Sequence, residues 1–147
     1  MAIHPDPPIP ESYWVRPGQL LAGAYPMRVG EAEHTLHQRV RQFLVVGITS
    51  FVDLTEAHEF VPYLPVFRAV VPEGTGLPAY QRLPIRNWDI PPPLMMVRIL
   101  DTIDTALAEG QSVYVHCAGG IGRTGTVIGC YQHHYDTLKF FFTFIFD

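Results

Sequence analysis

The most constraining feature of the sequence is a glycine-rich segment between a short apolar run and a helical pattern. The run Val113–His116 is rich in β-branched and aromatic residues, which favour a strand, and a helix is predicted over residues 122–135. Five residues separate Cys117 from Arg123, and three of them are glycines. Glycine can adopt the tight or left-handed backbone that a closed loop needs. The segment therefore predicts a strand, a compact loop and a helix in immediate succession.

Strand and helix signals alternate along the rest of the chain. Short β-branched or aromatic runs predict strands, and apolar residues at helical spacing predict helices. The predicted strands are Tyr13–Val15, Leu20–Ala22, Ile48–Leu54 and Gln81–Ile85, and the predicted helices are Glu31–Val46 and a segment from Pro93 to Gly110. Residues 55–79 predict an irregular stretch with at most a helical turn, and Pro84 confines its strand to a sheet edge. This alternation predicts an α/β fold with a central, largely parallel sheet flanked by helices.

Length and composition indicate one folded domain. The chain has 147 residues, of which 48% are hydrophobic and 16% are charged, so a substantial core can form. We expect a proline-rich, irregular lead-in over residues 1–12, a folded domain over 13–135 and a separate phenylalanine-rich tail over 136–147.

Charge and cysteine content exclude several classes of function. The net charge is −4, so there is no basic surplus for binding a nucleic-acid backbone. No apolar run approaches the roughly 20 residues that cross a bilayer, and the N-terminus lacks the pattern of a signal peptide. Two cysteines do not make a disulfide scaffold, and neither CxxC nor HExxH spacing occurs. We therefore expect a reduced, cytoplasmic protein that needs no metal or other cofactor.

The glycine-rich loop has the chemistry of an anion site with a nucleophile at its base. Successive backbone N–H groups in such a loop, at a helix N-terminus, bind anions. The Arg123 guanidinium can add a bidentate contact to two phosphate oxygens. The same positive field favours the Cys117 thiolate, which is the nucleophilic form. The predicted phosphate-binding residues are Ala118, Gly119, Gly120, Ile121, Gly122 and Arg123.

The motif HCxxGxxRTG over residues 116–125 resembles the signature of the cysteine-based protein tyrosine phosphatase superfamily, in particular the small bacterial-type dual-specificity phosphatases. The resemblance covers roughly residues 10–135 and implies a protein tyrosine phosphatase-like fold with the phosphate loop between a strand and a helix N-terminus. It also implies hydrolysis of phosphomonoesters through a phosphocysteine intermediate. The implied substrates are proteins that carry phosphotyrosine, with phosphoserine and phosphothreonine as further candidates.

The resemblance further implies a proton donor on a loop upstream of the cysteine. Asp89, beside Trp88 and 28 residues before Cys117, fits that place, although the proline that often precedes such an aspartate is absent. A solvated loop aspartate, or an N-cap of the following helix, is the alternative interpretation.

His116 and Thr124 have roles implied by the resemblance, whereas a role for Asp53 or Glu56 follows from the strand expected to end at Asp53 beside the strand that leads to Cys117. His116 would orient the loop and support the thiolate, and Thr124 would place its hydroxyl near the sulfur. Asp53 or Glu56 could brace the Arg123 guanidinium, or cap the next turn instead.

Two other functions stay open at this point. One is a phosphoinositide or small-molecule phosphatase, which ranks second because the loop contains no lysine to meet extra phosphates. The other is a pseudophosphatase that binds phosphopeptides without hydrolysing them. The sequence also departs from the family after the loop helix, where the resemblance implies further helices, and we interpret these C-terminal helices as truncated. Five of the seven residues 140–146 are phenylalanine, a composition that predicts possible self-association through this tail.

Overall fold

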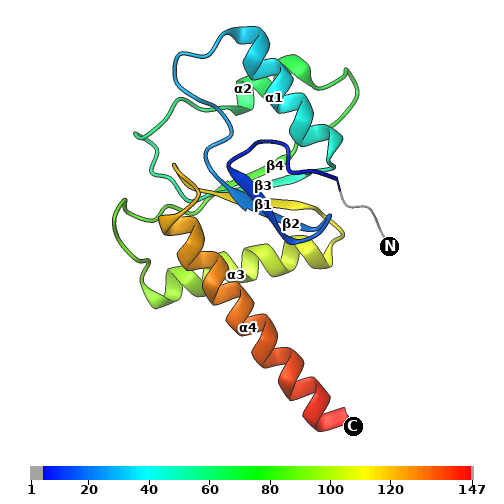
Figure 1. The fold of residues 1–147 in the computed structure, drawn as a ribbon, viewed down its shortest axis with the longest axis vertical. Coiled ribbons are helices and arrows are strands. Elements are labelled where there is room, and N and C mark those ends of the chain that lie inside the picture. The colour runs from blue at the N-terminus through cyan, green and yellow to red at the C-terminus, as the bar shows by residue number, and fades with distance from the viewer. Residues whose placement is uncertain (1–4, 147) are drawn as a thin grey trace.

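The structure is a computed structural model that describes the backbone of residues 5–146, with side chains described up to His134 and at Asp136. Figure 1 shows a central sheet with helices on both faces, and α4 extends away from the body of the domain. The elements follow in the order β1 (Ser12–Arg16), β2 (Leu20–Gly23), α1 (Glu33–Val45), β3 (Ser50–Asp53), α2 (Leu64–Val70), β4 (Ala79–Arg82), α3 (Pro93–Ala108), β5 (Val113–His116) and α4 (Gly122–Phe146).

The sheet has five strands in the order β1-β2-β5-β3-β4. Only the β1–β2 pair is antiparallel, and the three other pairs are parallel. The α/β architecture with a largely parallel sheet is therefore confirmed. β5 lies at the centre of the sheet between β2 and β3. In the segment that follows β5, Cys117, Gly120 and Arg123 are buried, whereas Gly119, Ile121 and Gly122 are exposed.

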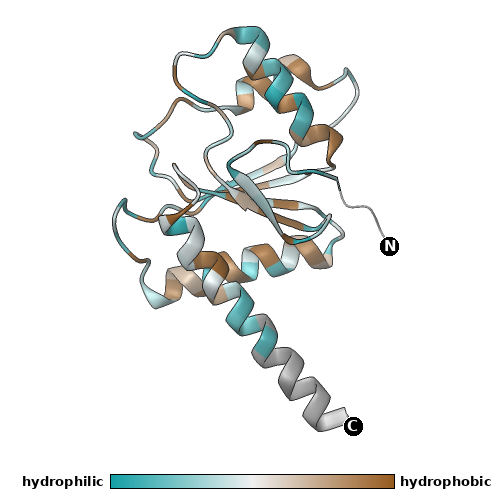
Figure 2. Cartoon of the chain, viewed as in Figure 1, coloured by the Kyte–Doolittle hydropathy of each residue, from teal (hydrophilic) through white to brown (hydrophobic). Residues whose placement is uncertain are grey.

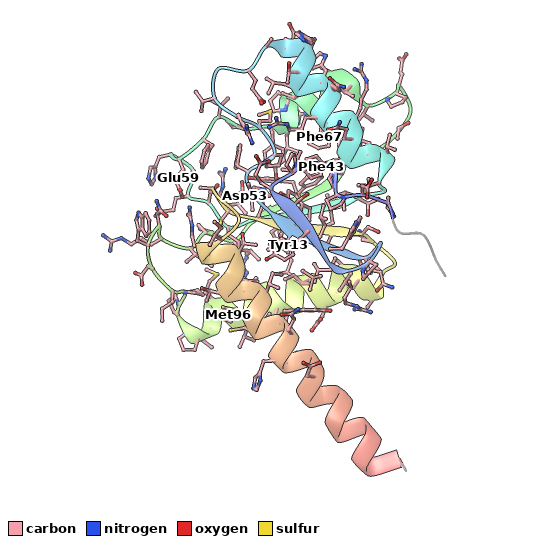
Figure 3. All side chains as sticks on the ribbon, in the orientation of Figure 1. Tyr13, Phe43, Asp53, Glu59, Phe67 and Met96 are labelled. Carbon is pink, nitrogen blue, oxygen red and sulfur yellow. The ribbon has the colours of Figure 1, made fainter. Side chains whose placement is uncertain are left out.

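Alternate residues of the central strands supply two cores, one on each face of the sheet. Val113 and Val115 of β5 pack with the cluster that includes α3 and the start of α4, whereas Tyr114 packs with the aromatic cluster under α1 and α2. This alternation is the expected period of a strand that is buried on both faces. Figure 2 shows hydrophobic residues along the central strands, and Figure 3 places Phe43 and Phe67 in the layer between α1, α2 and the sheet.

Three predicted elements differ from the structure. Residues 55–79 contain α2, a helix of seven residues that begins with a proline in its first turn. The edge strand β4 ends at Arg82 rather than Ile85, although the backbone N–H groups of Leu83 and Ile85 still donate to β3 and the residue after it. Helix α4 continues to Phe146, past the predicted end at Tyr135, because no glycine or proline interrupts residues 130–146.

Consequently the backbone shows no break at the predicted boundary between the domain and the tail. The side chains of residues 137–146, on which the predicted self-association depends, lie outside the described residues.

Candidate active site

The glycine-rich loop leaves β5 at His116 and enters α4 at Gly122, as the sequence predicted. Its tight packing against the end of β2 requires glycine at position 120. Gly120 has a φ of +75°, and a Cβ built there would lie 2.4 Å from the carbonyl carbon of Gly23. The carbonyl of Ala118 accepts a hydrogen bond of 3.0 Å from the Tyr25 N–H. The loop is therefore held against β2 by close backbone contact.

A cavity of about 700 Å³ opens above this loop. Its lining comes from the loop, from the start of α4 and from residues 87–90 before α3. The lining residues are Asn87, Trp88, Asp89, Ile90, Cys117, Ala118, Gly119, Ile121, Gly122, Arg123 and Thr126. Cys117 is only 3% exposed, so its thiol lies at the bottom of this cavity. The structure thus brings together the three side chains to which the sequence assigned nucleophile, oxyanion binding and proton donation.

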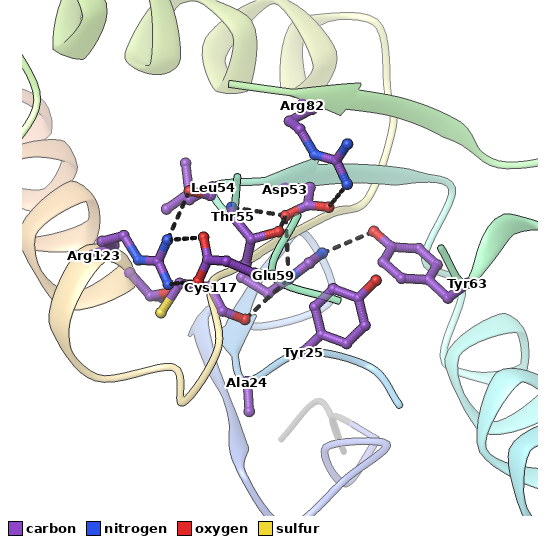
Figure 4. Close-up of polar contacts among 12 residues, drawn as sticks. Ala24, Tyr25, Asp53, Leu54, Thr55, Glu59, Tyr63, Arg82, Cys117 and Arg123 are labelled. Atoms are coloured by element: carbon purple, nitrogen blue, oxygen red, sulfur yellow. Dashed lines mark hydrogen bonds and ion pairs between the residues drawn. The ribbon is translucent and has the colours of Figure 1, made fainter. Parts of the chain in front are cut away.

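Glu59, rather than Asp53 or Glu56, braces the Arg123 guanidinium. Two Glu59 oxygens accept hydrogen bonds from Nη1 and Nη2 of Arg123, both at 2.7 Å, as Figure 4 shows. Nη1 also donates to the carbonyl of Ile85 at 3.0 Å. The hydrogen bonds from Arg123 hold the pKa of Glu59 below its usual range, and Glu59 in turn raises the pKa of Arg123. The expected brace by Asp53 or Glu56 is therefore corrected.

The bracing contacts leave one edge of the guanidinium for a ligand. Arginine has five N–H donors in a fixed plane. Glu59 and Ile85 take the donors of Nη1 and one donor of Nη2. The Nε–H and the second Nη2–H remain, and these two form the kind of fork that binds two oxygens of a phosphate. Because Arg123 is 4% exposed and lines the cavity, its remaining fork is fixed before any anion binds.

His116 is fully buried behind the nucleophile and is neutral. Its Nδ1 lies 3.3 Å from the carbonyl oxygen of Cys117, which can only accept, so we assign the proton to Nδ1. Nε2 then accepts from the Tyr63 hydroxyl at 2.8 Å. Burial lowers the pKa of His116 to about 4, more than the facing Asp53 raises it. His116 therefore contacts the Cys117 backbone and carries no charge near neutral pH, while its predicted role in orienting the loop and supporting the thiolate stays a prediction.

Asp53, at the end of β3, completes the support of His116. Its Oδ1 accepts from the N–H and hydroxyl of Thr55 at 2.8 and 2.6 Å and lies 4.0 Å from Nδ1 of His116. Its Oδ2 accepts from the Tyr80 hydroxyl at 2.6 Å and forms an ion pair with Arg82 at 3.4 Å. Burial opposes ionisation of Asp53, but His116, Thr55 and Tyr80 outweigh it and lower its pKa.

The Asp89 segment differs from the loop because it is held only by local contacts. Asp89 is exposed, and its Oδ1 accepts from the N–H of Ile90 at 2.8 Å. Its own N–H donates to the carbonyl of Arg86 at 3.1 Å. Trp88 is 98% exposed and has a φ of +62°, which is rare for a bulky residue. Asp89 does not belong to α3, because that helix begins at Pro93 and its N-cap residue is Pro92.

Thr124 is fully buried in the first turn of α4. Its hydroxyl donates to the carbonyl of Gly23 at 3.4 Å. Among the hydrogen bonds of the described residues, no contact joins this hydroxyl to the Cys117 sulfur. The role predicted for Thr124 near the sulfur therefore stays a prediction, and its observed contact attaches α4 to β2.

Sequence reasoning missed Glu59 and Tyr63. Both lie in the stretch between β3 and the first turn of α2, which the sequence predicted to be irregular, so no periodicity indicated which side chains face the loop. Within the described residues, no group of three or more histidine, cysteine or acidic side chains is arranged to hold a metal ion. No helix in that part of the chain is both long and apolar enough to cross a membrane.

The fold and the loop together define the class: a dual-specificity phosphatase-like domain of the cysteine-based protein tyrosine phosphatase superfamily. More narrowly, the chain belongs to the family described as "PTP-SAK: Swiss Army Knife protein, DSP-PTPase phosphatase domain", whose family model matches residues 10–138.

A curated relative matches a smaller part of the chain than the family model does. A protein of Invertebrate iridescent virus 3, named "Putative tyrosine phosphatase 067L", is 33% identical over 101 residues, which make up 64% of this chain. The chain spans only 38% of the length of that viral protein.

Solved structures of phosphatases share the fold. The active form of Tk-PTP superposes with a TM-score of 0.59 at 26% identity, covering 80% of this chain and 69% of that one. PTPMT1 in complex with PI(5)P superposes with a TM-score of 0.60 at 18% identity, covering 82% and 70% of the two chains. At that identity the second likeness concerns the fold alone.

Proposed function

We propose that this domain hydrolyses phosphomonoesters through a phosphocysteine intermediate. We further propose that its substrates are proteins phosphorylated on tyrosine, and that it also hydrolyses phosphoserine and phosphothreonine if it has dual specificity. The observation that carries the proposal is the shared cavity of Cys117, Arg123 and Asp89, in which Arg123 is already braced by Glu59. A buried thiol below a fixed cationic fork suits attack on a bound phosphate.

In the first step the Cys117 thiolate attacks phosphorus, and a P–S bond forms as the P–O bond to the leaving group breaks. The free fork of Arg123 and the loop N–H groups stabilise the equatorial oxygens. Asp89 donates its proton to the leaving oxygen. In the second step a water molecule attacks phosphorus and gives its proton to Asp89. The P–S bond then breaks and releases inorganic phosphate and the thiolate.

Charge in the cavity favours a singly phosphorylated substrate. Among the described lining residues, Arg123 is the one cation, and none is lysine. A phosphoinositide carries at least one further phosphate, so it would need additional cations near the loop. A phosphoinositide or small-molecule phosphatase therefore stays the second candidate, and a binding-only pseudophosphatase is the third.

The test measures hydrolysis of p-nitrophenyl phosphate, a phosphotyrosine peptide and a phosphoinositide in the presence of EDTA. We expect turnover of the first two, and none with Cys117→Ser, because serine lacks a base to activate it. Arg123→Lys should lower kcat/KM by orders of magnitude, since lysine keeps the charge but loses the planar fork.

Two results would contradict this proposal. Substantial hydrolysis by Cys117→Ser would exclude the covalent cysteine mechanism. Tight binding of the phosphotyrosine peptide to the wild-type protein without any turnover would instead establish the pseudophosphatase.

A further inference from the structure

A second hollow adjoins the catalytic cavity. It has a volume of about 340 Å³ and shares Ala118 and Gly119 of the phosphate loop with that cavity. Its other walls include Met27, Val29 and Phe60, which come from the segments after β2 and before α2. The same three side chains also line a third hollow of about 210 Å³, farther from the loop. Together the two hollows, here called the flanking groove, lead away from the nucleophile.

The flanking groove is largely apolar and has a firm base. The rings of Tyr25 and Phe60 stack with centroids 4.2 Å apart, and the Tyr25 hydroxyl donates to the carbonyl of Val61 at 2.7 Å. Val29 is 88% exposed and Val61 is 74% exposed. Isolated exposed valines are ordinary on a protein surface, but two of them beside one hollow that adjoins a catalytic cavity indicate a binding surface.

Charges in the flanking groove disfavour an anionic ligand. Among the described residues that line it, Arg28 is the one cation, and it forms an ion pair with Glu11. Its backbone N–H donates to Glu31 at 3.3 Å. Glu31 in turn pairs with Arg39 at 2.6 Å, so these charges are already matched within the protein. A phosphoinositide carries a phosphodiester beside its phosphomonoester, and the described residues that line the groove offer no unpaired cation to that second negative charge.

We propose that the flanking groove binds an apolar side chain close to the phosphorylated residue of a peptide substrate. The inference rests on the proposed function, because it assumes that a phosphorylated residue occupies the catalytic cavity. An extended peptide advances about 3.3 Å per residue, so a side chain one to three positions away reaches the adjoining hollow across Ala118 and Gly119. The groove then selects among phosphopeptides, while the loop binds the phosphate that they share.

The test uses phosphotyrosine peptides in which a single leucine is moved through the three positions on either side of the phosphotyrosine, in an otherwise serine- and glycine-rich sequence. We expect one or two leucine positions to raise kcat/KM by roughly tenfold over the peptide without leucine, the range for one apolar group entering a pocket. Val29→Asp should abolish this preference. Val45→Asp is the matched control, because Val45 is 85% exposed on α1 and lines neither the cavity nor the groove.

Three outcomes would overturn the inference. Equal hydrolysis of all peptides by the wild-type protein would show that the groove selects nothing. A preference that survives Val29→Asp, or that Val45→Asp removes equally, would place the selective surface elsewhere. If p-nitrophenyl phosphate is hydrolysed but no peptide is, peptides are not the substrates. Failure to hydrolyse any phosphomonoester would instead contradict the proposed function itself, and this inference with it.

Discussion

The phosphate loop and the Asp89 segment face the same cavity but are built in opposite ways. Cys117 and Arg123 are at most 4% exposed, and Arg123 donates to Glu59 and to backbone carbonyls. Trp88, beside Asp89, is 98% exposed, and the Asp89 carboxylate accepts from its neighbour Ile90. The comparison indicates that the proposed nucleophile and anion site are fixed in advance, whereas Asp89, the proposed proton donor, is held by local contacts at the rim of the cavity.

The topology of the sheet explains this difference. The loop follows β5, the central strand, so it starts between the ends of β2 and β3, and its residues Cys117, Gly120 and Arg123 are buried. The Asp89 segment follows β4, which is an edge strand, and its last contact with the neighbouring strand region is the Ile85 N–H bond to Leu54. Between Ile85 and the start of α3, the hydrogen bonds of the described residues are local. We therefore expect substitutions in the phosphate loop to weaken anion binding. Substitutions of residues 87–90, at the rim of the cavity, should instead lower the rate of turnover.

Apart from substitutions of Cys117 and Arg123 themselves, the largest expected effect comes from Gly120→Ala. A Cβ at this position would collide with the backbone of Gly23, and a φ of +75° is unfavourable for alanine. We expect kcat/KM to fall by roughly 10³-fold, together with loss of vanadate binding, because the loop must move. Gly119→Ala is the control, since a Cβ there would meet no atom within 4 Å. Similar behaviour of the two variants would refute the packing argument.

The next prediction concerns the stability of the folded protein and the buried imidazole of His116, which lies behind the phosphate loop. The pKa of His116 is about 4 in the folded protein, against 6.5 ordinarily, so the unfolded chain binds more protons between these values. The free energy of unfolding should therefore fall as the pH is lowered from 6.5 to 4, by about 3 kcal/mol. Urea unfolding across this range measures the slope, which His116→Gln should flatten.

Exposed His34 provides the control for this measurement. His34→Gln should keep the wild-type slope of stability against pH. If His116→Gln does not fold, NMR titration of the His116 ring in the wild-type protein gives its pKa directly. A His116 pKa near 6.5, or an unchanged slope in His116→Gln, would contradict a neutral, buried imidazole.

A smaller effect on turnover is expected from substitution of Asp89, at the rim of the cavity. Asp89→Asn should slow hydrolysis of a phosphotyrosine peptide by ~10²-fold, the usual contribution of a general acid. For activated aryl phosphates kcat/KM should be affected less, because it reports the steps up to departure of the leaving group and not the later hydrolysis of the phosphocysteine. Vanadate affinity should stay close to that of the wild type, because Asp89 does not hold the anion. The check is a leaving-group series on both proteins, and an identical dependence on the leaving-group pKa would exclude Asp89 as the acid.

The smallest effect is expected from removing the brace of Arg123. Glu59→Gln keeps the shape but loses the charge, so kcat/KM should fall by about tenfold, as is common for a partner that orients a binding group. Glu56→Gln is matched in chemistry and lies three residues away, yet Glu56 lies 3.9 Å from His58 and acts on Arg123 only as a weaker, more distant charge than Glu59. A larger loss in Glu56→Gln than in Glu59→Gln would show that the brace is misassigned.

Much of this architecture could be predicted from the sequence. The loop and its helix start were predictable because a nearly unique spacing of cysteine, glycines and arginine follows a β-branched run. The positions of β2, β3 and β5 were predictable because both faces of these strands are buried and most of their residues are apolar, with polar Asp53 and His116 at the ends of β3 and β5.

The remainder depends on contacts that local sequence does not encode. Glu59 braces Arg123 across 64 positions, and Tyr63 contacts His116 across 53. Asp53 was correctly placed at the end of β3, but its partners are Thr55, Tyr80 and Arg82 rather than Arg123. Which of several nearby carboxylates faces the arginine is decided by the path of residues 54–63, and no periodic pattern describes that path.

The most direct test of the account is to trap the intermediate. Wild-type protein and Asp89→Asn are mixed with p-nitrophenyl phosphate, quenched in acid within the first turnovers, and analysed by mass spectrometry of the peptide that contains Cys117. Loss of the Asp89 carboxyl group should slow hydrolysis of the phosphocysteine more than it slows departure of the activated p-nitrophenolate leaving group. The account therefore predicts a phosphate adduct on Cys117 that accumulates in Asp89→Asn and is scarce in the wild type. Turnover without any adduct on Cys117 in either protein, or an adduct on another residue, would contradict it.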